Sequence, residues 1–192
     1  MRASSGLIAM ALLLGLGCVS SILGSGEDLA WRLRAPIDRG VEHHDYAHSY
    51  LREERWALAE HEATAAIEEF LIVDEFHAET PLWTAQGAEI AYLGTAAYNA
   101  RAEALVFQGA LRCADSDLEL ATLFGQICVA KGTQAATHKW VSKCNAMQTR
   151  IETVKRLLRD LSERRGSHGR ELCPPAHDVQ TVTARRERLE GP

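Results

Sequence analysis

Apolar residues recur every three or four positions between residues 37 and 165, and no convincing alternation of apolar and polar residues interrupts them. This spacing places apolar side chains on one face of an α-helix, whereas a β-strand alternates. The clearest stripe covers residues 136–161, inside a stretch from 133 to 165 that contains no Pro or Gly. The pattern predicts an all-α domain over 37–165. It ends in one long helix, or in two helices with a bend near Asn145.

Three signals for helix starts divide this domain. Pro36 marks the first start, Thr80 is placed to cap a second helix that begins at Pro81, and the Asp-Ser-Asp sequence of residues 115–117 supplies the third. Pro is common in the first turn of a helix, and Ser, Thr and Asp accept hydrogen bonds from the free backbone amides there. We expect these signals to lie between the units of a repeat.

A repeat is also visible in pairs of positions that lie seven residues apart. The pairs are Ala47 and Glu54, Gly87 and Gly94, and Gly125 and Gly132, and their first members are 40 and then 38 residues apart. Small residues allow two helices to approach closely. We therefore expect a short α-solenoid of about three helical hairpins, closed by the long C-terminal helix as a cap. The stripe of that last helix could instead form a coiled-coil seam, which leaves the oligomeric state open.

The residues of each repeat resemble the tetratricopeptide pattern. The matching positions are Ala47, Tyr50, Trp56, Ala59 and Ala66 in the first repeat, Trp83, Gly87, Ile90 and Gly94 in the second, and Phe124, Gly125, Cys128 and Gly132 in the third. Phe107 and Ala110 lie four residues later than the family spacing, which implies a repeat of about 38 residues in place of roughly 34. The resemblance covers residues 41–146.

The resemblance implies a concave groove lined by the first helix of each hairpin. The residues that it places in this groove are His44, His48, Arg52, Thr84, Tyr92, Thr122 and Gln126. They mix hydrogen-bonding groups with aromatic surface, which suits an extended peptide or a helix of another protein. The expected function is therefore the binding of a protein or peptide partner.

The N-terminal 26 residues have the composition of a secretory leader. They carry one charged side chain, Arg2, followed by an apolar run over residues 7–14. Residues 14–18 (Leu-Gly-Leu-Gly-Cys) resemble the lipobox of bacterial lipoproteins, which implies lipidation of Cys18, although Gly15 replaces the usual aliphatic residue. Cleavage near residues 24–26 and an uncleaved membrane anchor are the alternatives. Secretion across the inner membrane is expected, to the periplasm or to an anchored position at the outer membrane.

Four cysteines remain if Cys18 is set aside: Cys113, Cys128, Cys144 and Cys173. An even number suits an oxidising compartment, and four cysteines allow three pairings. Buried free thiols at Cys128 and Cys144 are the alternative. Residues 166–192 contain Gly, Pro and scattered charges with few apolar residues, so we expect a flexible tail, except where a paired Cys173 would hold it.

The charge is unevenly distributed along the chain. Residues 40–120 carry 16 acidic and 4 basic side chains, a difference of −12, and residues 121–192 carry 7 acidic and 13 basic, a difference of +6. The whole chain has a formal charge of −5. A nucleic acid would be repelled by most of this surface, so nucleic-acid binding is not expected.

His44 and His48 lie one helical turn apart and could present two imidazoles to one metal ion. Together with His43, they suggest an alternative function as a periplasmic metal-binding or sensor domain, although the sequence assigns no third ligand and no cofactor. No Gly-x-Ser-x-Gly motif or phosphate-binding loop is present, so an enzyme is not expected. The preferred interpretation is an exported, membrane-anchored scaffold that binds partners in the cell envelope.

Overall fold

A computed structural model describes residues 26–78, 84–136, 138–165 and 173 of the chain. The chain divides into two units, residues 1–35 and 36–192. Within the first unit, the described residues are the start of a helix that continues into the second. The account below concerns the second unit.

The described residues form five helices and contain no strand, so the predicted all-α class is confirmed. The helices are α2 (Gly26–Arg52), α3 (Trp56–Ala78), α4 (Thr84–Gln108), α5 (Leu111–Gln134) and α6 (His138–Arg165). Across these described helices, none combines the length and the apolar character that a membrane span requires.

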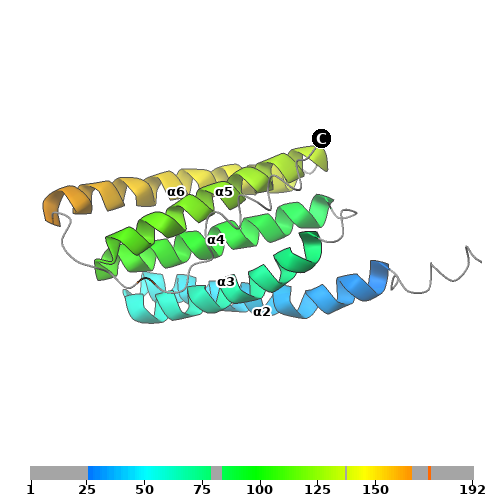
Figure 1. Ribbon diagram of the computed structural model, residues 1–192, viewed down its shortest axis with the longest axis horizontal. Coiled ribbons are helices and arrows are strands. Elements are labelled where there is room, and N and C mark those ends of the chain that lie inside the picture. The colour runs from blue at the N-terminus through cyan, green and yellow to red at the C-terminus, as the bar shows by residue number, and fades with distance from the viewer. Residues whose placement is uncertain (1–25, 79–83, 137, 166–172, 174–192) are drawn as a thin grey trace, which may run out of the picture. The chain divides into compact units, whose positions relative to one another are not determined.

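Short connections make successive helices antiparallel, so that α2, α4 and α6 run in one direction and α3 and α5 in the other (Figure 1). Glu54 has a left-handed backbone (φ 59°) in the turn after α2, and Gly109 (φ 85°) has one after α4. Ala136 (φ 51°) has the same conformation between α5 and α6. Only Gly109 is the residue that usually signals such a turn, which explains why the sequence did not reveal the other two.

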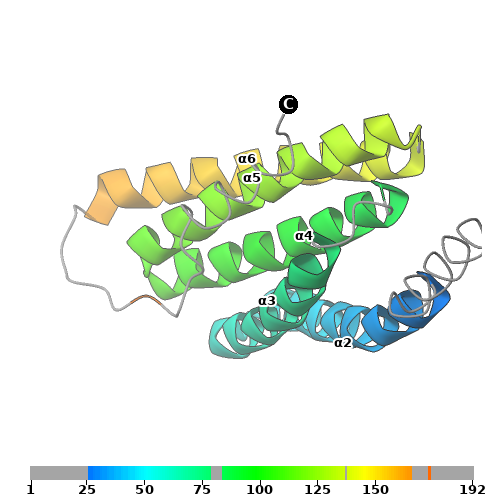
Figure 2. The same cartoon turned by 45° about the vertical axis from the view of Figure 1, so that its right-hand side comes forward.

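Helix α4 lies at the centre of the packing and contacts α3, α5 and α6, an arrangement visible in Figures 1 and 2. All residues from 93 to 102 are buried, and Ala is the most frequent residue of this helix. A helix that is apolar on every side is typical of a position surrounded by other helices. Alanines on α2, α3 and α4 let these three helices approach closely: Ala47, Ala59, Ala63, Ala100 and Ala104 form one buried cluster.

The long C-terminal helix is present as predicted, as one helix over His138–Arg165. The members of its stripe that are buried are Cys144, Met147, Ile151, Val154 and Leu158. Four of these, from Met147 onward, join the main core that α4 and α5 share. The stripe therefore covers the neighbouring helices. Ala136 belongs to the turn before the helix rather than to the stripe.

Two predicted helix starts are wrong. Pro36 lies inside α2, and residues 115–117 lie inside α5, which begins at Leu111. A proline removes one backbone donor, and α2 nevertheless continues beyond it to Arg52. Asp117 is buried in an ion pair instead of capping a helix. The third predicted start, at Thr80 and Pro81, lies outside the described residues.

The predicted hairpin within the second repeat is also wrong. A helix–turn–helix unit of about 38 residues leaves roughly 17 residues for each helix, whereas α4 alone has 25 and carries both Gly87 and Gly94. The small residues nevertheless mark helix contacts. A Cβ atom at Gly94 would meet the ring of Phe124 at 3.6 Å, and one at Gly125 would meet Thr95 Cγ2 at 3.6 Å. The glycines therefore line faces between single long helices.

Two disulfides join the four cysteines of the domain, Cys113 to Cys173 and Cys128 to Cys144. Their Cα atoms are 5.2 and 6.0 Å apart, within the range that a disulfide requires. The structure thus selects one of the three pairings that the sequence allowed. The predicted leader with Cys18, and the predicted flexible tail apart from Cys173, lie outside the described residues.

Candidate functional site

Four polar side chains from three parallel helices meet on one side of the domain. We call His44 and His48 of α2, Glu103 of α4 and Arg150 of α6 the polar cluster. His44 and His48 share a face because they are one turn apart, and their rings meet edge to face with centroids 5.0 Å apart. Glu103 and Arg150 are 47 residues apart in the chain and become neighbours only because α4 packs against α6.

Arg150 links the three helices. Its Nη1 donates to His48 Nε2 at 2.8 Å, and its Nη2 donates to Glu103 Oε2 at 3.1 Å. A guanidinium has donors only, so His48 Nε2 must be the acceptor and the ring proton must sit on Nδ1. Burial, followed by the charge of Arg150, lowers the pKa of His48 to about 4. His48 is therefore neutral near neutral pH, as this hydrogen bond requires.

His44 occupies the more enclosed part of the polar cluster. Its side chain is 14% exposed, and its Nδ1 lies 3.6 Å from the carboxylate of the exposed Asp45. Burial lowers the pKa of His44, although Asp45 acts in the opposite direction. The buried Nε2 atom has no hydrogen-bond partner among the described residues. His44 thus retains one unused hydrogen-bonding atom beside His48.

The charged pair of the polar cluster remains accessible to solvent. The side chains of Arg150 and Glu103 are 36% and 24% exposed, and Arg52, one turn beyond His48, is exposed. An accessible guanidinium and carboxylate can exchange hydrogen bonds with a polar partner. This arrangement suits recognition of another chain, and none of its members is positioned as a nucleophile beside a base.

The structure brings together only some of the residues that the sequence placed in a groove. Tyr92 lies on α4 against Trp140 of α6, with ring centroids 5.6 Å apart. Thr122 donates to the carbonyl of Leu118 at 2.6 Å within α5, and Gln126 is exposed on the same helix. Since α5 packs against α4 and α6, these two are separated from the residues on α2. Thr84 is the first residue of α4, and its side chain lies outside the described part.

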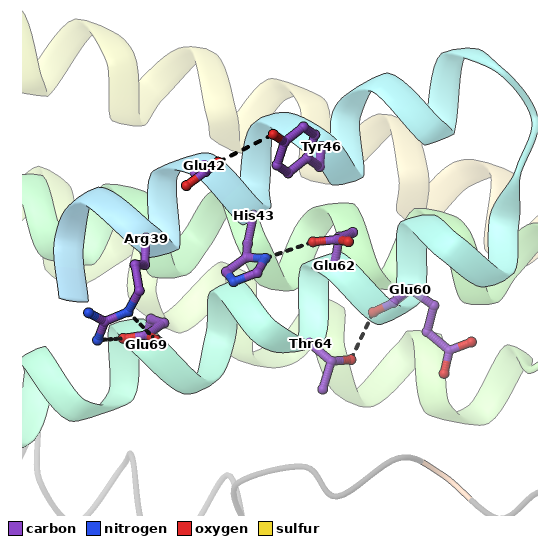
Figure 3. A network of polar contacts seen from close by, with 8 residues as sticks. All are labelled: Arg39, Glu42, His43, Tyr46, Glu60, Glu62, Thr64 and Glu69. Atoms are coloured by element: carbon purple, nitrogen blue, oxygen red, sulfur yellow. Dashed lines mark hydrogen bonds and ion pairs between the residues drawn. The ribbon is translucent and has the colours of Figure 1, made fainter. Parts of the chain in front are cut away.

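The three histidines proposed as alternative metal ligands do not converge, and Figure 3 shows one of them, His43, directed toward Glu62 of α3. His43 lies toward α3, where its Nδ1 is 2.7 Å from Glu62 Oε2, whereas His44 and His48 belong to the polar cluster. The Nε2 atom of His48 already accepts a hydrogen bond from Arg150. Nowhere in the described part of the chain do three or more His, Cys, Asp or Glu residues form a group that could hold a metal ion.

Figure 3 also shows what fixes α2 against α3. Arg39 makes a two-bond ion pair with Glu69, at 2.7 and 2.8 Å, one turn before His43. A Cβ atom at Gly40 would collide with the ring of Phe70, so the two helices approach closely there. Exposed ion pairs add little stability. We therefore assign these contacts to the alignment of the two helices.

Sequence reasoning missed a second polar group, the buried ion pair of Arg101 and Asp117. Arg101 donates two hydrogen bonds of 2.7 Å to the carboxylate, and the side chains are 1% and 2% exposed. Burial acts to lower the pKa of Arg101, but Asp117 outweighs it and the net shift is upward. A signal existed: Arg101 is the single charged residue in the apolar stretch 90–102. Glu103 and Arg150 had no such signal.

Searches against protein families, curated proteins and solved structures found no match for this chain.

Proposed function

We propose that the protein is an exported helical scaffold, attached to the membrane by its N-terminal leader, that binds a protein or peptide partner along the side formed by α2, α4 and α6. The observation that carries this proposal is the polar cluster. Its carboxylate, guanidinium and neutral imidazoles come from three helices and stay partly exposed. The proposal is one of binding without catalysis, metal or other cofactor.

The direction of the helices supports an extended binding face. The helices α2, α4 and α6 run in the same direction (Figure 1), and the hydrogen bonds of Arg150 bring one turn of each together. A polypeptide bound at this turn would contact Arg150 together with Glu103 and the exposed Arg52. Peptide recognition by packed helices commonly combines such polar contacts with the neighbouring apolar surface.

The leader and the disulfides support export. A charged residue followed by an apolar run is typical of a signal sequence, and both disulfides require an oxidising compartment to persist. A bacterial cell envelope satisfies both conditions, and in it the partner would be another envelope protein. The acidic balance of residues 40–120 favours a partner other than nucleic acid.

Site-specific photo-crosslinking in the native host tests the proposal. A photoreactive residue at Arg52, beside the polar cluster, should capture a discrete partner. The same residue at Glu68, exposed on α3, should not. Arg150→Ala in the Arg52 background should weaken capture without changing the circular dichroism spectrum. Equal capture at both positions, or a folded Arg150→Ala chain that binds as before, would refute this binding face.

A further inference from the structure

A second surface feature lies on α4 and α6, away from the polar cluster. We call Tyr92, Lys139, Trp140 and Lys143 the lysine–aromatic patch. Lys143 Nζ lies 4.8 Å from the centre of the Trp140 ring and 5.4 Å from that of Tyr92, and Lys139 Nζ lies 5.3 Å from Trp140. Both lysines are exposed, and both aromatic rings are half-buried.

The two lysines of the patch have no carboxylate partner among the described residues. No Asp or Glu occurs between residues 120 and 151, a stretch that also contains Lys131. The acidic residue closest along α4 is Glu89, three positions before Tyr92. The patch is therefore positively charged in a protein that is acidic as a whole.

The patch lies at the end of the second unit where the chain enters it. Hydrogen bonds join His48, Glu103 and Arg150, so these residues lie at the same height along the three parallel helices. Ten to twelve residues earlier, on α2, α4 and α6, are Pro36, Tyr92 and Trp140. At about 1.5 Å per residue, these three lie at a second height, some 15 to 18 Å away. Residue 36 is the first residue of this unit, so the patch and that residue share one end of it.

We propose that the lysine–aromatic patch docks on an anionic phospholipid surface. Trp and Tyr are enriched at the boundary between water and lipid, where their rings face the hydrocarbon and their polar atoms the headgroups. Lysines beside them are attracted to anionic headgroups. The inference extends the proposed membrane attachment by adding a second contact, which would orient the α2, α4 and α6 side relative to the membrane.

Fluorescence of Trp140 in the full-length chain tests the proposal. Trp31, Trp56 and Trp83 are replaced by Phe, and the chain is reconstituted into vesicles that contain brominated lipids, which quench tryptophan on contact. Vesicles of phosphatidylglycerol are compared with vesicles of phosphatidylcholine. Lys139→Gln with Lys143→Gln removes the patch charge, and Arg156→Gln with Arg159→Gln, at exposed positions on the same helix, is the matched control.

We expect Trp140 to be quenched and its emission to shift to shorter wavelength in phosphatidylglycerol vesicles only. Each lysine is attracted to an anionic surface, so the two substitutions remove two such attractions. Together they should lower the ratio of docked to undocked patch about 30-fold. The arginine control should change it much less. Salt at about 1 M, which shortens the screening length to roughly 3 Å, should release the patch. Circular dichroism should be unchanged in every variant.

Four results would overturn the proposal. If the chain floats with the vesicles but Trp140 is not quenched, the leader attaches the protein and the patch does not dock. If quenching is equal in both lipids or survives the lysine substitutions, the patch charge is not responsible. If polyglutamate shifts Trp140 emission while vesicles do not, the patch binds an acidic polypeptide instead. Failure of the chain to float at all would contradict membrane attachment itself and the docking that rests on it.

Discussion

The buried ion pair offers the sharpest test of what stabilises this domain. Asp117→Asn keeps the shape of the side chain and removes its charge, which leaves the guanidinium of Arg101 buried without a counter-ion. Both groups are almost fully enclosed, and both hydrogen bonds are 2.7 Å long. Removal of one partner from such a pair costs about 3 to 5 kcal/mol. That is a large part of the roughly 5 to 15 kcal/mol that stabilises a typical domain.

The assay is urea unfolding followed by circular dichroism, with the disulfides intact. For a slope of about 2 kcal/mol per molar urea, the midpoint should fall by about 2 M. Asp115→Asn is the matched control because Asp115 is exposed on the same helix, and it should change the free energy of unfolding by less than about 0.5 kcal/mol.

A second variant separates the loss of the pair from the loss of packing. Arg101→Met combined with Asp117→Leu removes both charges and fills the space, so it should recover most of the stability. Equal stability of Asp117→Asn and wild type would refute the assignment of a buried, charged pair. A double variant as unstable as Asp117→Asn would show that shape rather than charge is decisive.

Three further predictions concern helix packing, pH and the disulfides. Gly125→Leu should destabilise by about 1 to 3 kcal/mol because side chains of α4 and α6 lie 3.5 to 3.6 Å from the added Cβ, while Gly125→Ala should be tolerated. The pKa of His48 falls from 6.5 to about 4 on folding, so stability should be full above pH 6.5. It should decline between pH 6.5 and about 4, where the unfolded chain takes up a proton that folded His48 does not. Loss of the Cys128–Cys144 disulfide by double Ala substitution opens a link across 16 residues and should cost about 3 kcal/mol.

Each of these predictions has a clear contrary result. Equal melting temperatures for Gly125→Leu and Gly125→Ala would remove the argument for close helix approach. The amide of His48→Gln can accept the same hydrogen bond without titrating, so this variant should lose less stability as the pH falls toward 4. An unchanged pH profile would show that other groups cause the loss of stability. Peptide mapping under non-reducing conditions should recover the Cys128–Cys144 pair, and a different pairing would contradict the structure.

The sequence by itself determined the local properties of this protein. The helical class follows from apolar spacing, and the stripe of α6 was predicted because side chains three and four apart always share a helix face. Glycines at helix contacts were also identified, since a small residue has the same steric effect wherever helices cross. The even number of cysteines predicted pairing but not the pairs.

Only the tertiary structure decided the features that join distant parts of the chain. Left-handed turns at Glu54 and Ala136 follow α2 and α5 without the glycine that usually marks such an end. Gly87 and Gly94 suggested a hairpin where α4 is one long helix. Arg150 meets His48 across 102 residues. The neighbouring sequence predicted Asp117 as part of a helix start, but it is instead paired with Arg101. Helix periodicity is set by neighbours in sequence, whereas such partners are set by which faces pack together.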